Sequence, residues 1–534
     1  MKLILRYGAV LVLCFCLILA GCRPSIRQKE KALRLTGELA PAAVSDQNRV
    51  FYEIFVGSFS DGNGDGKGDL RGLIDRLDYL NDGDPASGKS LGVEGLWLMP
   101  INPSPSYHKY DVTGYTKVDS SYGTVDDMKE LAAACHERGM TLIIDLVLNH
   151  TSKYHPWFTA AQKARSEGDA LSRYYDFYSV STEHTGGGWY YFATDPEGRD
   201  WYYEGNFDSG MPELNYDCEA VWEEIGKIFS FWLSDVGIDG FRLDAVKYFC
   251  YGDDGKNVEV LRRLRAMAES VKSDVYLVGE NWSAQESIAL YDQAIGCFDF
   301  PFSQAEGYVG SAVLMKDAEY FVTSAAYYYN LIHSKNPDAI LRPFLSNHDM
   351  DRCAGYFSVS NGQMQMAANL YLLYSGSPFL YYGEEIGMKG SRGSSMSDAN
   401  RRLAMLWGDG DTVRDPGSAS YSGQNQINGT VLSQVGKDDS LFTHYKKLLA
   451  LRAANPEIAR GEVSAVYFGN SAVAGLRFTY EGSTVYVIHN LGSTEVTVDV
   501  SGLGKVLRGF AGEGEASLRK GGLTLSGRTS AIIR

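Results

Sequence analysis

Eight short apolar runs alternate with longer amphipathic segments between residues 51 and 383, and this alternation restricts the fold more than any other feature. The runs are rich in β-branched and aromatic residues, as buried strands are. Most are separated by helix-like stretches such as Val125–Arg138, Ala220–Ser234 and Val258–Val271. Eight strands that alternate with helices predict an α/β fold of the (β/α)8 TIM-barrel type. The runs are Phe51–Phe59, Val93–Ile101, Thr141–Leu148, Ile238–Val246, Val275–Trp282, Cys297–Phe302, Leu341–Asn347 and Pro378–Gly383.

Two segments depart from this alternation. Residues 151–217, between the third and fourth runs, are rich in aromatic, Gly and polar residues and are too long for a plain loop. We therefore expect an inserted subdomain there, with the barrel formed by residues 46–150 and 218–450. Residues 451–534 contain strand-like runs such as Ala472–Tyr480, joined by turns with Gly, Ser and Asn, and they predict an all-β module.

The N-terminus is typical of an exported protein. Lys2 and Arg6 precede an apolar run, Ala9–Ala20, which is too short to span a bilayer and has the length of a signal-peptide core. No later stretch reaches about 18 consecutive apolar residues, so we expect the remainder of the chain to be soluble.

The apolar run ends in Leu19-Ala20-Gly21-Cys22, which resembles the lipobox of bacterial lipoproteins. The resemblance implies that residues 1–21 are removed and that Cys22 is acylated. Residues 22–45 are polar and read as a tether. We expect a protein anchored to a bacterial membrane, at the cell surface or the periplasmic face, by its N-terminal lipid. The alternative is an ordinary signal peptide that contains a cysteine.

The formal net charge of −16 argues against nucleic acid or anionic lipid as the main partner, and it suits a neutral ligand. The five cysteines after Cys22 are widely spaced and contain no Cys-x-x-Cys pair, so a zinc site is not expected. One disulfide is possible outside the cytoplasm, and the spacing does not assign it.

Charged side chains follow four of the predicted strands, at the ends where a (β/α)8 barrel carries its reactive groups. Taken singly, each could be a structural ion pair. Paired carboxylates beside an arginine suit glycoside cleavage, which needs one anion near the anomeric carbon and one protonated acid at the leaving oxygen. An adjacent arginine keeps one carboxylate ionised, and crowding with other carboxylates raises the pKa of the acid. The residues are Asp145, Asn149, His150, Arg242, Asp244, Lys247, Glu280, His348 and Asp349.

The motifs around these residues resemble the four signature regions of the α-amylase family of glycoside hydrolases (family 13). They are DLVLNH (145–150), GFRLDAVK (240–247), GENW (279–282) and SNHD (346–349), and MPELN (211–215) lies in the insertion. The resemblance covers roughly residues 46–450. It implies a TIM barrel with an inserted subdomain, a C-terminal β-sandwich and an α-glucan as the partner.

The resemblance also implies roles for residues at matching positions. Asp244 corresponds to the nucleophile, Glu280 to the general acid and base, and Asp349 to the carboxylate that stabilises the transition state. The residues implied in substrate binding are Arg242, which orients Asp244, His150 and His348, which hydrogen-bond the sugar, Tyr110, which stacks beneath it, and Lys247 on the leaving-group side.

A loop after the first predicted strand alternates oxygen-bearing side chains with glycines, a pattern that suits Ca²⁺. Its twelfth position is Gly72 rather than Glu, so it is not an EF-hand. It resembles a calcium loop in one branch of the family, which implies a structural calcium ion; the alternative is a solvated acidic turn. The implied ligands are Asp61, Asn63, Asp65, the carbonyl of Lys67, and Asp69.

The MPELN motif lies between the versions typical of exo-acting α-glucosidases and of enzymes that cleave maltooligosaccharides, which implies an intermediate subfamily with α-amylase activity. We therefore expect retaining, endo-type hydrolysis of α-1,4-glucosidic bonds in starch, glycogen or maltooligosaccharides by a monomer. Two activities of the same family remain open, exo-α-glucosidase and 4-α-glucanotransferase. A lipoprotein that binds glycans without cleaving them is the alternative from another class.

Overall fold

The computed structural model describes residues 46–183, 187–393 and 397–534. The predicted signal peptide, the tether and the lipidation site at Cys22 lie outside these residues. Within the described part of the chain, no helix combines the length and the apolar character needed to cross a membrane.

Six parallel strands form a curled sheet in the order β8-β7-β3-β2-β1-β9. Almost every residue of these strands is buried, because side chains fill the interior of the sheet and helices cover its outer face. This two-sided burial explains why the strands read as continuous apolar runs. The strands lie within six of the eight predicted runs: β1 (Phe51–Ile54), β2 (Gly95–Leu98), β3 (Thr141–Leu146), β7 (Gly240–Leu243), β8 (Tyr276–Gly279) and β9 (Phe379–Tyr381).

The sixth and seventh predicted runs are not regular strands. The sixth run forms one parallel β-bridge with β8, through Cys297. The seventh run forms one with β9, through Phe344. A backbone hydrogen bond of 3.1 Å from Asp299 joins the two runs. Pro301 and Pro343 lie in them and have no N–H to donate, which prevents longer ladders. The two runs close the ring between β8 and β9, and the predicted (β/α)8 barrel is confirmed.

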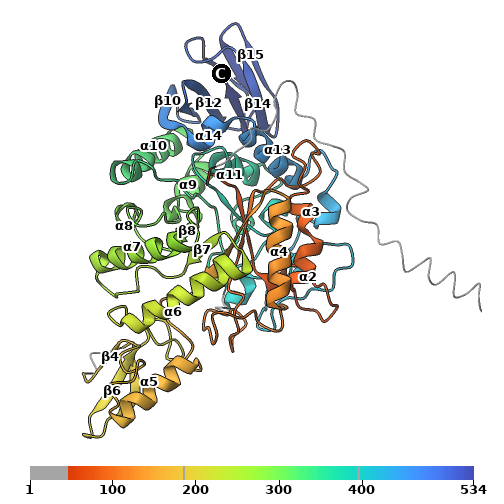
Figure 1. The fold of residues 1–534 in the computed structure, drawn as a ribbon. Coiled ribbons are helices and arrows are strands. Elements are labelled where there is room, and N and C mark those ends of the chain that lie inside the picture. The colour runs from red at the N-terminus through yellow and green to blue at the C-terminus, as the bar shows by residue number, and fades with distance from the viewer. Residues whose placement is uncertain (1–45, 184–186, 394–396) are drawn as a thin grey trace, which may run out of the picture.

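Helices surround the strands (Figure 1). The predicted helices near residues 125, 220 and 258 are present as α4, α6 and α7. Thr124 begins α4 with a capping box, in which its side chain and that of Asp127 exchange hydrogen bonds with the backbone. The helices are α2 (Leu70–Asp75), α3 (Leu77–Leu80), α4 (Val125–Glu137), α6 (Glu219–Phe229, continued by a π-helical turn over Ser230–Val236), α7 (Asp254–Val271), α8 (Gln285–Tyr291), α9 (Tyr308–Met315), α10 (Ala318–Lys335), α11 (Gln363–Leu372), α12 (Val431–Gln434), α13 (Leu441–Ala453) and α14 (Pro456–Arg460), with 3-10 turns at Val56–Ser58, Phe300–Phe302, Cys353–Gly355, Glu384–Ile386, Asp398–Arg401 and Gly423–Asn425.

The segment between β3 and α6 folds into a helix and a small sheet. The sheet contains β4 (Val180–Ser181), β5 (Trp189–Thr194) and β6 (Asp200–Glu204) in the order β4-β6-β5. Phe158 of α5 (Pro156–Glu167) packs against aromatic rings of the sheet, including Tyr203 at 5.0 Å between ring centroids. In Figure 1 this unit lies at the opposite end of the barrel from the C-terminal strands.

The C-terminal strands form two antiparallel sheets, ordered β10-β11-β12-β17-β14 and β13-β16-β15. One apolar cluster contains Ile488 and Ile533 from the first sheet and Val498 and Leu523 from the second. Two sheets that share a core are a β-sandwich, as the family resemblance implied. The strands are β10 (Glu462–Asn470), β11 (Val473–Tyr480), β12 (Ser483–Asn490), β13 (Val496–Asp499), β14 (Leu507–Gly512), β15 (Ala516–Arg519), β16 (Gly522–Leu525) and β17 (Thr529–Ile533).

Candidate active site

A cavity of about 610 Å³ opens at the carboxyl ends of the barrel strands. Five carboxylates line it, and three of them follow barrel strands: Asp244 after β7, Glu280 after β8 and Asp349 after the seventh run. The structure thus brings together side chains that are far apart in the sequence. The remaining lining residues are His108, Tyr110, His150, Phe207, Asp208, Met211, Ala245, Lys247, Tyr248, Trp282, Asp398 and Arg402.

The guanidinium of Arg242 lies behind these carboxylates and is fully buried. Its Nη1 donates to Asp244 Oδ1 at 2.6 Å and to Asp145 Oδ1 at 2.8 Å, and its Nη2 lies 3.1 Å from Glu280 Oε2. The strand register sets this arrangement, since Asp145 of β3 is the direct partner of Arg242 in β7. One cation therefore holds three carboxylates, and it places Asp244 and Glu280 side by side.

Glu280 is held in a second way by the backbone that follows Asp244. The N–H of Ala245 donates to Glu280 Oε2 at 3.0 Å. Ala245 has a φ of 50°, a left-handed conformation that is uncommon for a residue with a side chain, and strain of this kind gathers at functional sites. The turn after β7 therefore fixes both carboxylates at once.

The pKa of Glu280 is raised to about 7. Burial is the largest cause, Arg242 opposes it, and the charges of Asp244 and Asp349 add to it. The sequence predicts that crowding with other carboxylates raises the pKa of the acid. This effect is present at Glu280, but burial raises its pKa more. With this pKa a carboxyl group carries a proton for much of the time near neutral pH.

Asp349 has the opposite environment. His348 Nε2 lies 3.0 Å from its Oδ2, and Arg402 Nη2 donates to its Oδ1 at 2.8 Å. Burial alone would raise the pKa of Asp349, but the His348 charge and hydrogen bond, with Arg402, hold it well below its usual range. Burial alone would lower the pKa of His348, but the charges and hydrogen bonds of Asp349 and Glu53 outweigh this effect and raise the pKa to about 9. Asp349 is thus an anion beside two cations.

The other predicted substrate-binding residues also lie at the cavity. The hydroxyl of Tyr110 is 2.6 Å from His348 Nε2, and the two rings are nearly parallel at 12°. His150 is buried, and no described residue hydrogen-bonds its Nε2. Lys247 Nζ donates to the carbonyl of Trp282 at 2.6 Å. Six of the eight predicted catalytic and substrate-binding residues line the cavity; Arg242 and His348 lie directly behind it.

Sequence reasoning missed several residues of the site. Glu53 is a buried carboxylate in β1 that accepts from His348 Nδ1 at 2.6 Å, and a charge inside an apolar strand was a signal that could have found it. Arg402 and Asp398 come from an irregular segment that carries no periodic pattern. Phe207 lies in the predicted insertion, residues 151–217, where aromatic residues are too common to single one out.

The predicted calcium loop is a tight acidic turn before α2. Asp61 accepts from the N–H groups of Gly64 and Gly66 at 2.6 and 2.7 Å, and its Oδ2 also accepts from Thr412 at 2.6 Å. Asp69 caps α2 and accepts from Gly72 at 2.7 Å. Among the residues that the structure describes, no three His, Cys, Asp or Glu side chains form a cluster fit for a metal ion. The oxygen-rich donor set remains chemically suited to a hard cation.

The family model for the alpha amylase catalytic domain matches residues 53–461. The chain belongs to the α-amylase family of glycoside hydrolases. Alpha-amylase 3 of Dictyoglomus thermophilum is 37% identical over 454 residues, which cover 84% of this chain and 86% of that protein. Oligo-1,6-glucosidase of Bacillus cereus is 28% identical over 529 residues, 84% of this chain and 90% of that protein.

Among solved structures, Amy13B of Eubacterium rectale superposes with a TM-score of 0.85 at 37% identity, covering 92% of this chain and 96% of that one. The α-amylase family member described here is therefore an enzyme, a glycoside hydrolase of the α-amylase type.

Proposed function

We propose that this α-amylase family enzyme hydrolyses α-1,4-glucosidic bonds in starch, glycogen or maltooligosaccharides with retention and with endo-type action. The observation that carries the proposal is the shared guanidinium of Arg242. It holds the Asp244 and Glu280 carboxylates side by side in one cavity, while burial raises the pKa of Glu280 to about 7. A protonated acid next to an anionic carboxylate is what glycoside cleavage needs.

In this proposal Asp244 attacks the anomeric carbon while Glu280 gives its proton to the leaving oxygen. The bond to the leaving sugar breaks, and a bond forms between the carbon and Asp244. Glu280, now an anion, takes a proton from water. That water attacks the same carbon and releases Asp244, so two inversions give net retention. Asp349 stabilises the positive charge that develops on the sugar.

The remaining predicted residues hold the sugar at the cleaved position. His150 has a buried Nε2 available for a sugar hydroxyl, and His348 is fixed between Glu53 and Asp349. Tyr110 presents its ring to the cavity as a stacking surface, and Lys247 lies on the side of Glu280 and Trp282. Arg242 orients Asp244.

Proton NMR of maltoheptaose hydrolysis tests the mechanism. Retention requires that the α-anomer forms first and then mutarotates. A first-formed β-anomer would falsify the assignment of Asp244 as a nucleophile. In a crystal structure the two carboxyl groups should lie about 5–5.5 Å apart, against roughly 6.5–9.5 Å in inverting enzymes.

Product chromatography separates the proposed activity from its alternatives. Endo-type hydrolysis yields a mixture of shorter maltooligosaccharides early in the reaction. An exo-α-glucosidase releases glucose and leaves a chain one unit shorter at each step, and a 4-α-glucanotransferase makes chains longer than its substrate. The name of the Dictyoglomus relative supports the first outcome. No turnover of any substrate would point to a lipoprotein that only binds glycans.

We also propose that the loop from Asp61 to Asp69 binds a structural Ca²⁺ ion. Calcium is common in this family, and carboxylate, amide and carbonyl oxygens are its preferred ligands. A chelator should lower the melting temperature and added calcium should restore it, since the ion binds the native state. Asp65→Ala should remove the response and leave the catalytic carboxylates in place. An unchanged melting temperature under both treatments identifies a solvated turn.

We further propose that the protein is exported and anchored by a lipid at Cys22. The support is the sequence of the apolar run and of the Leu19–Cys22 segment. Cys22→Ser should release the protein from membranes or block its processing, since the thiol is the acylation site. Normal processing and normal membrane binding of this variant would exclude the anchor.

A further inference from the structure

Both ring nitrogens of His348 face oxygen acceptors inside the protein. Nδ1 lies 2.6 Å from Glu53 Oε1, and Nε2 lies 3.0 Å from Asp349 Oδ2 and 2.6 Å from the Tyr110 hydroxyl. That hydroxyl donates its own proton to Asp145 Oδ2 at 3.0 Å, so its oxygen is free to accept from Nε2. The ring of His348 is fully buried, and each of its nitrogens has a carboxylate within hydrogen-bond distance.

Only the charged form of this ring suits both contacts. A neutral imidazole has one N–H, so one of its nitrogens would direct a lone pair at a carboxylate. An imidazolium donates from both nitrogens at once. The pKa of His348 agrees with this geometry, because burial lowers it but Asp349 and Glu53 raise it to about 9. His348 is therefore a cation over the neutral pH range.

Glu53 is the part of this arrangement that lies farthest from the chemistry. It is buried in β1 between Tyr52 and Ile54, and it is not one of the residues that line the active-site cavity. A buried carboxylate costs free energy unless it is paired, and His348 is its charged partner. An amide oxygen could accept the same hydrogen bond from Nδ1 without a charge. The hydrogen bond alone therefore does not account for a carboxylate at this position.

The charged and titratable groups around His348 come from several elements of the barrel. They are Glu53 from β1, Tyr110 from the segment after β2, Asp145 from β3, Arg242 from β7, the adjacent Asp349, and Arg402, whose Nε donates to the carbonyl of His348 at 3.2 Å. Among these groups Glu53 is the one that contacts Nδ1, on the side of the ring away from Asp349.

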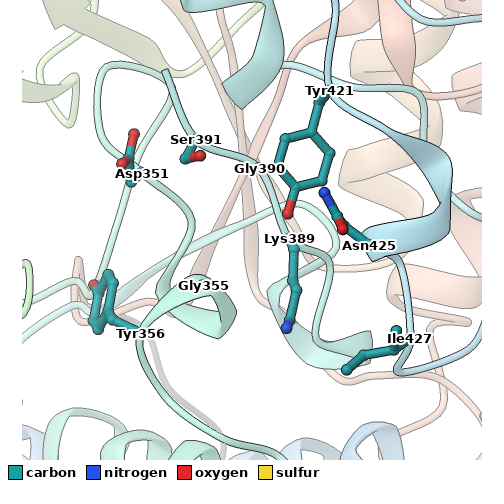
Figure 2. A pocket seen from close by; sticks show the side chains of 9 residues that line it. All are labelled: Asp351, Gly355, Tyr356, Lys389, Gly390, Ser391, Tyr421, Asn425 and Ile427. Atoms are coloured by element: carbon teal, nitrogen blue, oxygen red, sulfur yellow. The ribbon is translucent and has the colours of Figure 1, made fainter. Parts of the chain in front are cut away.

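A second cavity, of about 510 Å³, holds other charged side chains close to Asp349 in the sequence (Figure 2). They are Asp351 and Lys389, and Asp351 accepts from Arg401 Nε at 2.8 Å. None of the described residues that line this cavity also lines the active-site cavity. Asp351 thus offers a carboxylate near Asp349 that belongs to a different cavity.

The charge of His348 acts on Asp349. The His348 charge and hydrogen bond, together with Arg402, hold the pKa of Asp349 well below its usual range although burial raises it. If His348 were neutral with its proton on Nδ1, Nε2 would repel the Asp349 carboxylate instead of donating to it. In the proposed function Asp349 stabilises positive charge on the sugar, so the protonation of His348 bears on the rate.

We propose that Glu53 is a positioning residue that acts through His348, its buried carboxylate keeping the ring an imidazolium across the working pH range of the enzyme. The contribution of Glu53 is its charge rather than its hydrogen bond. This proposal rests on the proposed function and deepens it, because it sets the pH range over which Asp349 keeps its charged partner.

Kinetics at two pH values test the proposal. Glu53→Gln keeps an oxygen for Nδ1 and removes the charge. An opposite charge in contact changes a pKa by roughly 1–3, so His348 should lose its proton between about pH 6 and pH 8 in this variant. The kcat/KM for maltoheptaose should be within about threefold of wild type at pH 5 and about tenfold or more below it at pH 8. A role in packing alone would lower the rate equally at both pH values.

Three further variants complete the test. Glu385→Gln removes an equally buried glutamate, which accepts from Tyr52, the residue before Glu53. Asp351→Asn removes a carboxylate two residues from Asp349. In both controls the ratio of kcat/KM to wild type should be the same at pH 5 and pH 8. Glu53→Asp keeps the charge and should recover part of the rate at pH 8. A pH-dependent loss in the controls as large as in Glu53→Gln overturns the proposal.

A titration of the histidine separates failure of this proposal from failure of the proposed function. The chain has nine histidines, and with a 13C label at Cε1 the NMR signal of His348 is the one missing from His348→Gln. In wild type this signal should report a charged ring up to about pH 8. In Glu53→Gln the ring should lose its proton at a pH lower by about 1 or more.

A neutral His348 at pH 7 in wild type overturns the proposal, and this result does not require Glu53→Gln to fold. An unchanged titration in Glu53→Gln, or equal rate losses at pH 5 and pH 8, overturns it as well. If the wild type cleaves no maltooligosaccharide, the proposed function fails, whereas the titration still reports whether Glu53 keeps His348 charged.

Discussion

Two groups of buried carboxylates in this enzyme invite comparison. One is the active-site group around Glu280, and the other is the pair Glu384 and Glu385 after β9. Glu280 and Glu384 both have a pKa raised to about 7, and in both burial is the largest cause. By pKa alone the two groups could not be told apart.

Their surroundings differ. Glu384 Oε1 accepts from the hydroxyls of Tyr371 and Tyr445 at 2.6 and 2.8 Å, and Glu385 accepts from Tyr52 and Tyr79 at 2.8 and 2.5 Å. Both glutamates are sealed from solvent. Glu280, in contrast, lines a cavity and contacts an arginine. A perturbed pKa therefore indicates a reactive group only where a cavity admits a substrate and a charged partner is present.

The largest expected effect contrasts the two glutamates directly. Glu280→Gln removes the proton donor, so the rate on maltoheptaose should fall by about 10³-fold or more, with little change in melting temperature. Glu384→Gln keeps an oxygen for Tyr371 and Tyr445 and touches no substrate, so its rate should stay within about twofold of wild type. Steady-state kinetics and thermal melts of both variants make the measurement.

Asp244→Asn is the companion variant for this comparison, because it removes the nucleophile and should be as inactive as Glu280→Gln. Near-normal turnover in Asp244→Asn or Glu280→Gln would remove the active-site assignment. A large rate loss in a well-folded Glu384→Gln variant would show that the sealed pair also serves the chemistry.

The pH profile sharpens the comparison with a smaller effect. Glu280 must carry its proton to act as the acid, and its pKa is about 7. Activity should therefore fall about tenfold per pH unit well above pH 7, when the group is ionised. The profile of kcat/KM should keep this limb in Glu384→Gln, although the carboxyl that this variant removes titrates in the same range in the wild type. If the fall in activity above pH 7 shifts to another pH in Glu384→Gln, the assignment of this fall to Glu280 is wrong.

The sequence predicted the barrel, and it predicted that charged side chains meet at the carboxyl ends of its strands, because both depend on local patterns. The roles of these side chains are those that the resemblance to the α-amylase family implies. Strands buried on both faces read as apolar runs, and the reactive groups follow them directly. The irregular sixth and seventh runs were not foreseen as such, although Pro301 and Pro343 were visible in the sequence. Each of these two runs forms only one parallel β-bridge, and whether that bridge forms depends on the neighbouring strand, β8 or β9, rather than on the sequence of the run.

Residues that reach the site from outside the strands were beyond such reasoning. Arg402 meets Asp349 across 53 residues of sequence, from a segment without periodicity. The seal around Glu384 and Glu385 also depends on tyrosines of distant elements, such as Tyr52 in β1 and Tyr445 in α13. Which buried carboxylate faces a cavity is a property of packing in three dimensions, and a linear pattern does not contain it.

The smallest predicted effect concerns stability, and it tests the sealed side of the comparison. Glu384 has a folded pKa of about 7 against an ordinary value of 4.5, so the native state holds its proton more tightly. Below pH 4.5 this contribution to stability is fully present, and it is lost as the pH rises through about 7. The full difference corresponds to about 3 kcal/mol.

Asp145, Asp299 and Glu280 have pKa values raised to about 7 as well, so only a comparison of variants isolates Glu384. Urea unfolding at pH 5 and pH 8 should show that the loss of stability with pH is smaller in Glu384→Gln than in wild type, by up to about 3 kcal/mol. An identical loss in both proteins would mean that Glu384 is not kept neutral by its seal, and the two groups of carboxylates would then differ in their pKa values as well as in access.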